Sequence, residues 1–383
     1  MSVPELRKWQ KQAILKWAEA GHRGIVSVVT GGGKTVFALA CIDLLKPLTT
    51  LIVVPTSALL DQWWSEVCAF FSLRLDDVHI VTRTKSLRPG TINVAVLNTA
   101  AGLLERKQPD CFLIVDECHK AASSYFRRVL NLPTNASLGL SATPDRPYDE
   151  GLADVLIPSL GPVIYTYDYA EARSDGVIVP FALKNIIFEL ESERQDEYEK
   201  LTRAIARTIE AEGADSPKAV ALLLRRARVL NLSEKRVFLA AKLVLANAGK
   251  RTLVFHEDIN ACQVIASALA RFGVASGIYH SRMPLRTRAK VLNEFRNGSL
   301  QALVTCRALD EGFNVPETEI GIIAASTATR RQRIQRLGRI LRPAEGKKSA
   351  TVYTLVASAS EVARLKEEEE NLDGVAKVSW RSE

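Results

Sequence analysis

The hexapeptide TGGGKT, Thr30–Thr35, decides the fold class through what lies on either side of it. The apolar run GIVSVV (24–29) precedes it, and the helix-forming run VFALACIDLL (36–45) follows it. A strand, a glycine loop and a helix in this order are typical of a phosphate-binding loop, whose backbone N–H groups surround an anion at the helix N-terminus. The alternative is a glycine-rich turn before a helix, because Val28 stands where the strict GxxxxGK[ST] pattern has glycine.

The residue types of this loop suit the phosphates of a nucleotide and a magnesium ion. Glycine lets the backbone approach phosphate oxygens where a Cβ atom would intrude. Lys34 is placed to reach the β- and γ-phosphates, and the Thr35 hydroxyl is placed to bind Mg²⁺. The expected nucleotide-binding residues of the loop are Thr30, Gly31, Gly32, Gly33, Lys34 and Thr35.

A pair of carboxylates supplies the second half of the expected chemistry. The run CFLIVDECH, Cys111–His119, is an apolar strand that ends in Asp116 and Glu117. Asp116 is placed to hold Mg²⁺ through its water shell, and Glu117 to orient and deprotonate an attacking water. An Asp-Glu pair alone is commonplace, but this one ends an apolar strand 82 residues after Lys34. Together with the loop it predicts a Mg-dependent nucleoside triphosphatase.

Short apolar strands alternate with helical stretches along the chain, which is typical of a parallel α/β architecture. Runs such as IVSVV and LIVV are continuous, as expected for strands covered on both faces. The first series of predicted strands is 24–29, 50–54, 78–81, 92–97, 111–116 and 137–141. The second series is 252–256, 275–280, 302–306, 319–326 and 350–356. Two series predict two doubly wound parallel-sheet lobes.

A charged, helical segment separates the two series. It includes predicted helices at 197–211 and 217–230, and it carries Arg225, Arg226 and Arg228 near its end. It is either a solvated connector or an arm that contacts the backbone of a nucleic acid. We therefore expect lobe 1 at 1–168, a linker with a helical insertion at 169–236, and lobe 2 with a short C-terminal helix at 237–383.

Composition permits this interpretation without requiring it. The 383 residues are 47% hydrophobic and 25% charged, and the formal net charge of +8 is compatible with a polyanionic partner. Six scattered cysteines contain no CxxC pair, which argues against a zinc or iron–sulfur site and suits a reducing, cytoplasmic setting. Neither a signal peptide nor an apolar run of about 18 residues is visible, so we expect a soluble protein.

Five segments occur in the order found in one large family. The motifs TGGGKT, DECH (116–119), SATPDRP (141–147), DEGFNVP (310–316) and QRLGRILRP (335–343) resemble motifs I, II, III, V and VI of superfamily 2 helicases. Residues 53–66 and 96–100 resemble motifs Ia and Ib. The stretches LGLSATPDRP and VFHEDINACQVIASAL are most similar to XPB-like and type-III-restriction-like DNA motors. The resemblance covers nearly the whole chain and implies two tandem RecA-like lobes.

The resemblance also implies roles for residues that spacing alone does not identify. Gln10 corresponds to the glutamine that reads adenine, and His119 would couple the hydrolytic site to Ser141 and Thr143. Arg339 and Arg342 correspond to arginine fingers supplied by lobe 2, each of a kind that accelerates phosphoryl transfer by roughly 10³- to 10⁵-fold.

Further contacts follow from the same resemblance. Gly312 and Asn314 correspond to positions that contact the nucleotide from lobe 2, although many members have Asp where this chain has Asn314. The implied nucleic-acid contacts are Pro55, Thr56, Asn98 and Thr99 in lobe 1, and His280, Ser281 and Thr305 in lobe 2.

Four functions are compatible with these features. The resemblance favours an ATP-dependent DNA helicase that uses Mg-ATP at the inter-lobe cleft to move along DNA and unwind it. Its expected partner is single-stranded or forked DNA. A duplex translocase without unwinding activity, working with a nuclease or repair subunit in a repair, restriction or defence complex, is the second. An RNA helicase is the third. The fourth is a small-molecule P-loop kinase or a nucleotide-switched interaction protein, against which the second lobe and the arginine pair argue.

Overall fold

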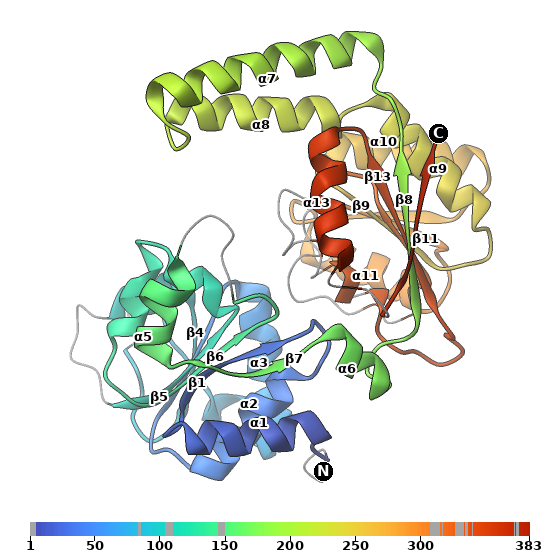
Figure 1. The fold of residues 1–383 in the computed structure, drawn as a ribbon. Helices are drawn as coiled ribbons and strands as arrows, with labels where there is room; N and C mark the ends of the chain where they lie inside the picture. Colours follow the sequence, from blue (N-terminus) through green and yellow to red (C-terminus); the bar gives the residue numbers. More distant parts are fainter. Residues whose placement is uncertain are drawn as a thin grey trace. The chain divides into compact units, whose positions relative to one another are not determined.

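The computed structural model describes residues 5–82, 86–103, 110–144, 150–306, 315, 317–325, 333, 336–338, 340–370, 372 and 375–383. The chain divides into two compact units, one that extends to Ala172 and one that comprises Arg173–Glu383 (Figure 1). Among the described residues, no helix combines the length and the apolar character needed to cross a membrane.

The first unit is built on a seven-stranded sheet with the order β3-β4-β2-β5-β6-β1-β7. Every pair in this sheet is parallel. The strands are β1 (Arg23–Val28), β2 (Thr50–Val54), β3 (His79–Ile80), β4 (Ile92–Val96), β5 (Cys111–Asp116), β6 (Thr134–Ser141) and β7 (Val163–Tyr167).

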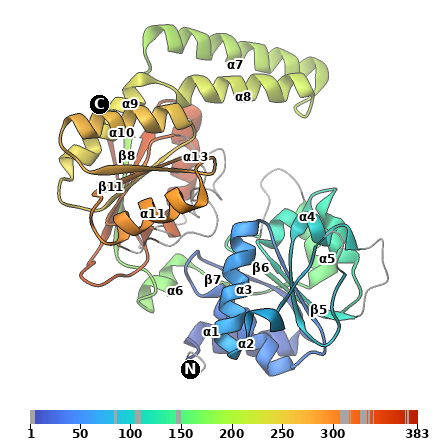
Figure 2. The same ribbon diagram turned by 180° about the vertical axis from the view of Figure 1, so that it is seen from behind.

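Helices cover both faces of this sheet. α2 and α3 lie on one face and α5 on the other (Figures 1 and 2). The helices are α1 (Lys8–Glu19), α2 (Lys34–Leu45), α3 (Ser57–Phe71), α4 (Leu97–Ala100), α5 (Ile157–Leu160) and α6 (Tyr169–Ser174), which reaches into the second unit. Shorter segments are the 3₁₀ turns η1 (Leu75–Asp77), η3 (Cys118–Ala122) and η4 (Phe126–Asn131), and the π-helical η5 (Leu152–Leu156).

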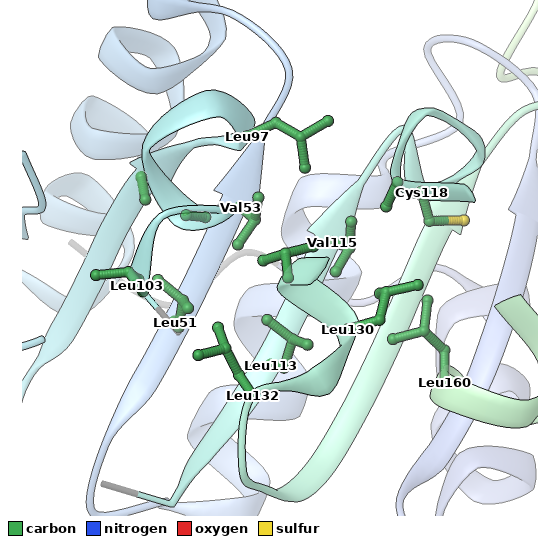
Figure 3. Close-up of a cluster of buried hydrophobic side chains, with 14 of the residues drawn as sticks. Leu51, Val53, Leu97, Leu103, Leu113, Val115, Cys118, Leu130, Leu132 and Leu160 are labelled. Atoms are coloured by element: carbon green, nitrogen blue, oxygen red, sulfur yellow. The ribbon is translucent and has the colours of Figure 1, made fainter. Parts of the chain in front are cut away.

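Burial on both faces explains why the central strands read as continuous apolar runs. Leu51 and Val53 of β2 and Leu113 of β5 point to one face, where they join a buried cluster with Leu130 and Leu160 (Figure 3). The residues between them along β2 and β5 are equally buried on the opposite face. This packing fixes the carboxyl ends of the strands, from which the candidate site is built.

The second unit repeats the architecture with a seven-stranded parallel sheet of order β10-β11-β9-β12-β13-β8-β14. Its strands are β8 (Phe181–Ile187), β9 (Thr252–His256), β10 (Ser276–His280), β11 (Ala302–Cys306), β12 (Ile320–Ile323), β13 (Ala350–Val356) and β14 (Lys377–Ser382). Its helices are α7 (Ser192–Glu212), α8 (Pro217–Asn231), α9 (Glu234–Ala246), α10 (Ile259–Arg271), α11 (Leu285–Arg296) and α13 (Ala359–Glu370).

Helices α7 and α8 pack against each other as a hairpin that extends from the second sheet (Figure 1). Gly213, at φ +85°, ends α7, and Ser216 caps α8 by accepting a hydrogen bond from the Ala219 N–H. At the base, Glu191 accepts hydrogen bonds from the Ser233 hydroxyl at 3.0 Å and from the Lys235 N–H at 2.8 Å. The two ends of the hairpin are therefore tied together.

The predicted fold class, two tandem RecA-like lobes with a helical insertion, is confirmed. The expected linker at 169–236 differs from the structure, because its segment 181–187 forms β8 and pairs with β13 and β14. Lys184 and Asn185 interrupt the apolar pattern there, which conceals a strand in the sequence. The expected C-terminal helix exists as α13, but the chain then adds β14, whose polar side chains are typical of an edge strand.

Candidate active site

Five neighbouring strands of the first sheet end at one edge and bring the predicted motifs together. Because parallel strands share the direction of their carboxyl ends, loops that follow them meet at a common crevice. In sheet order these loops carry Asn98 and Thr99 after β4, Pro55 and Thr56 after β2, Asp116 and Glu117 after β5, Ser141 and Thr143 with β6, and the glycine loop after β1.

The glycine loop has a backbone that requires glycine. Gly31 and Gly33 have φ angles of +87° and +100°, and Gly33 is the N-cap of α2. A Cβ atom on Gly32 would lie 2.5 Å from Val28 Cγ1 and 3.0 Å from the Val29 carbonyl oxygen. Within the described residues, the buried Thr30 hydroxyl has no hydrogen-bond partner. A glycine loop that curves around the N-terminus of a helix, together with this buried hydroxyl, fits a phosphate ligand.

Three side chains at the start of α1 donate hydrogen bonds to carbonyl oxygens of this loop. The Arg7 guanidinium and the Trp9 indole N–H donate to the Gly32 carbonyl oxygen at 2.8 and 3.2 Å. The Gln10 side-chain amide donates to the Gly33 carbonyl oxygen at 3.0 Å, and its own carbonyl oxygen accepts from the Arg7 N–H at 2.8 Å. Gln10, expected to read adenine, is thus a buried brace of the loop in this structure.

Arg7 and Trp9 were not predicted as site residues. Trp9 is buried and stacks on Tyr167 at a ring distance of 5.0 Å. The apolar spacing of Trp9, Ala13 and Trp17 marks Trp9 as a core residue of a helix. Its contact with the loop depends on the packing of α1 beside β1 and β7, which the sequence does not state.

Lys34 and Glu117 form an ion pair at the centre of the site. Lys34 Nζ lies 3.0 Å from Glu117 Oε1, and the two side chains are only 13% and 12% exposed. Burial by itself lowers the pKa of Lys34, but the attraction of Glu117 and Asp116 outweighs it and raises that pKa. Burial raises the pKa of Glu117, but Lys34 and His119 outweigh this effect and lower it. Both groups are therefore charged at neutral pH.

A histidine connects this carboxylate to the next strand. His119 is buried, and its Nδ1 lies 3.5 Å from Glu117 Oε2 and 3.0 Å from the Ser141 hydroxyl oxygen. The same hydroxyl oxygen accepts from the Thr143 N–H at 3.1 Å. The structure thus joins the three residues that the sequence analysis expected to act together.

Asp116 has a partner for each carboxylate oxygen. Trp63 of α3 donates its indole N–H to Oδ2 at 2.9 Å, and the Glu117 N–H donates to Oδ1 at 3.0 Å. Burial raises the pKa of Asp116, and the positive charge of Lys34 opposes that rise. Trp63 was not predicted as a site residue. Leu60, Trp63 and Val67 have the spacing of a buried helix face, but nothing in the sequence links that face to Asp116.

The predicted nucleic-acid contacts of the first unit lie close together beyond this site. Val54 and Val96 are paired in register, so the residues that follow β2 and β4 are neighbours at the sheet edge. Pro55 and Thr56 are half-buried, and Asn98 is exposed. Thr56 caps α3 by accepting a hydrogen bond from the Leu59 N–H at 3.4 Å.

The corresponding residues of the second unit also share an edge. His280 ends β10 beside Cys306, which follows Thr305 in β11. Ser281 is exposed and His280 is half-buried, whereas the Thr305 side chain is fully buried and adds nothing to the surface. The structure therefore brings the first two to the surface together and does not do so for Thr305.

The remaining predicted residues of the second unit are only partly described. Arg339, Gly312 and Asn314 lie outside the described residues. Arg342 is half-buried, and its carbonyl oxygen accepts a hydrogen bond from Lys347 Nζ at 2.8 Å.

A glycine loop with its lysine, followed by a strand-ending carboxylate pair on the same parallel sheet, defines the class of P-loop nucleoside triphosphatases. Residues 4–146 match the family described as "Type III restriction enzyme, res subunit", and residues 234–344 match "Helicase conserved C-terminal domain".

Similar proteins support the same classification. The "DNA 3'-5' translocase XPB2" of Sulfurisphaera tokodaii is 28% identical over 382 residues, which cover 94% of this chain and 83% of that protein. The "DNA 3'-5' helicase XPB" of Kineococcus radiotolerans is 26% identical over 361 residues, which cover 92% of this chain and 60% of the relative. The chain thus spans less than two thirds of the second relative.

Solved structures share the fold. The ATP-dependent Type ISP restriction-modification enzyme LlaBIII bound to DNA has a TM-score of 0.70 at 15% identity, covering 100% of this chain and 31% of that one. Dbp5 of S. cerevisiae, bound to RNA and ADP BeF3, has a TM-score of 0.63 at 15% identity, covering 98% and 89% of the two chains. The chain therefore belongs to superfamily 2 of the helicases, in the XPB-like and type-III-restriction-like branch, and it is an ATP-hydrolysing enzyme.

Proposed function

We propose that this chain is a DNA motor that couples hydrolysis of Mg-ATP to movement along DNA in the 3′-to-5′ direction. The observation that carries the proposal is the arrangement along one sheet edge, where the glycine loop, Asp116 and Glu117 adjoin the loops after β2 and β4. The names of two XPB-type relatives support DNA as the track and 3′-to-5′ as the direction.

The residues around the glycine loop supply the hydrolytic chemistry. Glu117 accepts a proton from water as the water oxygen bonds to the γ-phosphorus and the bond to the bridging β–γ oxygen breaks, giving ADP and phosphate. Glu117 is paired with Lys34 at 3.0 Å. ATP phosphates compete for Lys34, so nucleotide binding releases Glu117 to face water.

The side chains at this edge also fit a magnesium ion. Asp116 and Thr35 offer the oxygen ligands that Mg²⁺ prefers, beside a cradle in which a Cβ on Gly32 would collide with the backbone. When bound, Mg²⁺ neutralises charge on the β- and γ-phosphates. Trp63 and the Glu117 N–H orient the Asp116 carboxylate before any ligand arrives. His119 is hydrogen-bonded to the Ser141 hydroxyl and lies within ion-pair distance of Glu117.

The second unit completes the motor in this proposal. Arg339 and Arg342 act as arginine fingers, and Gly312 and Asn314 contact the nucleotide, on the basis of their positions in motifs V and VI. Hydrolysis then depends on closure of the two units, so cycles of binding and release move two DNA-contacting surfaces relative to each other.

The track is contacted by Pro55, Thr56, Asn98 and Thr99 in the first unit and by His280 and Ser281 in the second. Hydroxyl, amide and backbone groups of this kind bind phosphates and sugars and do not read sequence. Thr305 is left out of this set because its side chain is fully buried. Strand separation at a fork is the more specific activity that we propose, and translocation on duplex without unwinding is the second candidate, favoured by the type-III-restriction match.

The proposal predicts that DNA stimulates ATP turnover. Turnover is measured with single-stranded, forked and duplex DNA and with RNA, each at several salt concentrations, because phosphate contacts weaken as salt rises. We expect at least tenfold stimulation by single-stranded or forked DNA, of the order that cleft closure on a bound strand provides. Stimulation by duplex alone, with triplex disruption and no strand displacement, selects the second candidate. Stimulation by RNA alone, or by no nucleic acid, contradicts the proposal.

A further inference from the structure

The hydrogen bond between Trp63 and Asp116 joins two sites that the proposed function treats separately. Trp63 lies on α3, the helix that begins beside the proposed DNA contacts Pro55 and Thr56. Asp116 lies at the end of β5 beside the catalytic Glu117. The indole N–H donates to Asp116 Oδ2 at 2.9 Å, and the Trp63 side chain is buried at 1% exposure.

Helix α3 is built to transmit a displacement along its length. Leu60, Trp63 and Val67 form a buried face of α3 that packs on β2 and β4. Trp63 is seven residues after Thr56, which places it two turns and about 10 Å from the start of the helix. DNA bound at the first turn of α3 would therefore act on the same helix that carries the Trp63 donor to Asp116.

The bond also has the character of a specific link. An indole N–H is a donor only, and when buried it requires an acceptor. Here the acceptor is a carboxyl oxygen, and a hydrogen bond to a carboxylate is stronger than a bond to a neutral oxygen. The adjacent Trp64 provides a contrast, because it is half-buried and donates to the Leu75 carbonyl oxygen at 3.1 Å, away from the carboxylates.

We propose that Trp63 is a positioning residue that couples DNA contact at the start of α3 to the orientation of the Asp116 carboxylate. The inference rests on the proposed function, since it takes Pro55 and Thr56 as DNA contacts and Asp116 as a Mg²⁺ ligand. Through this link DNA changes how well the site accepts a nucleotide with its metal ion. By reciprocity, the bound nucleotide changes the affinity for DNA by the same factor.

The test compares Trp63→Phe, which removes the donor and keeps an aromatic ring, with the matched control Trp64→Phe. Binding of a fluorescent, non-hydrolysable ATP analogue is titrated at equilibrium in three conditions: EDTA, Mg²⁺, and Mg²⁺ with single-stranded DNA. Two ratios are measured for each protein, the gain in affinity from Mg²⁺ and the further change on adding DNA. Thermal unfolding reports whether each variant is folded.

We expect Trp63→Phe to reduce each ratio by about three- to tenfold, the scale of one typical hydrogen bond. Its affinity in EDTA stays within about twofold of wild type, because the bond acts on the carboxylate and not on the glycine loop. Trp64→Phe keeps both ratios. A merely structural role for Trp63 would instead weaken binding equally in all three conditions, and that result overturns the inference.

A second variant keeps the question open to measurement if Trp63→Phe does not fold. Benzothienylalanine at position 63 has the shape of tryptophan with sulfur in place of the N–H, so it removes only the donor. Wild-type ratios in this variant also overturn the inference. If wild-type protein itself shows no effect of DNA, the proposed function fails. If wild-type protein responds to DNA and the position 63 variants respond equally, only the role of Trp63 fails.

Discussion

At the scale of single residues, the ion pair between Lys34 and Glu117 is the feature with the clearest chemical consequence. The two groups that would act on the γ-phosphate and on water hold each other at 3.0 Å in a site that is mostly closed to solvent. Each is kept charged by the other, as the raised pKa of Lys34 and the lowered pKa of Glu117 indicate. The lysine and the carboxylate are therefore held together as a mostly buried ion pair.

Replacement of Glu117, the proposed catalytic carboxylate, tests this interpretation. Glu117→Gln is expected to lower DNA-stimulated kcat by about 10²- to 10⁴-fold, the usual contribution of a general base. ATP affinity stays the same or rises up to about threefold, because Lys34 no longer has to leave an anionic partner. Turnover is measured by phosphate release and affinity by equilibrium titration. The exposed Glu19 on α1, changed to Gln, serves as the control. Near-normal kcat in Glu117→Gln would remove Glu117 as the base.

Some residues of the candidate site could be predicted from the sequence and others could not. The loop residues, Asp116 and Glu117 could be placed because a strand and a helix next to them leave one arrangement of the backbone. Trp63 could not be placed, because its partner is 53 positions away and depends on the packing of α3 over β2. Gln10 lies at the loop, where its side-chain amide donates to the Gly33 carbonyl oxygen, and its role toward adenine remains a prediction.

At the scale of elements, the buried apolar strands were predictable from the sequence, whereas β8 and β14, which polar residues interrupt, were not. Strands such as β5 are apolar throughout because both faces are covered. In β14 the half-buried Val378 and Trp380 alternate with exposed polar residues, and β8 contains Lys184 and Asn185, so neither strand is apolar throughout. The segment expected to be only a linker therefore supplies one strand of the second sheet in addition to the α7–α8 hairpin.

The α7–α8 hairpin offers a prediction at this scale. Its arginines are partly engaged within it, since Arg225 pairs with Glu197 at 2.8 Å and Arg226 lies over the Tyr198 ring. At the base, the Ser233 hydroxyl donates to Glu191 Oε1 at 3.0 Å, so the two ends of the hairpin lie close together. A short Gly-Ser connection can therefore replace residues 193–230 without opening the second sheet. If the hairpin is an arm for nucleic acid, its removal lowers DNA affinity by about three- to tenfold and reduces the salt dependence of binding.

The measurement for this prediction is a salt series of DNA-binding titrations on the shortened and full chains. ATP turnover without DNA serves as the control and should be equal in the two proteins, because residues 193–230 include none of the residues proposed to act in hydrolysis. Equal affinity and an equal salt slope would instead assign the hairpin the role of a solvated connector, which was the alternative raised by its charge pattern.

At the scale of the whole molecule, the predicted site residues are divided between two compact units of the same architecture. The nucleotide-binding loop and the carboxylates belong to the first unit, and Arg342 belongs to the second. A single nucleotide-switched domain would need only the first unit. The second sheet, with a helicase C-terminal match over residues 234–344, is the reason to expect movement as the output of hydrolysis.

The central claim is that hydrolysis drives movement along DNA, and one measurement tests it directly. DNA oligonucleotides, single-stranded or duplex, carry streptavidin on a biotin at either the 5′ or the 3′ end of one strand, and its release is followed with and without ATP. We predict ATP-dependent release at least tenfold faster than spontaneous release from the 5′ end, where a motor moving 3′-to-5′ arrives, and no acceleration in Glu117→Gln. Release that ATP does not accelerate at either end, from either form of DNA, would contradict the account.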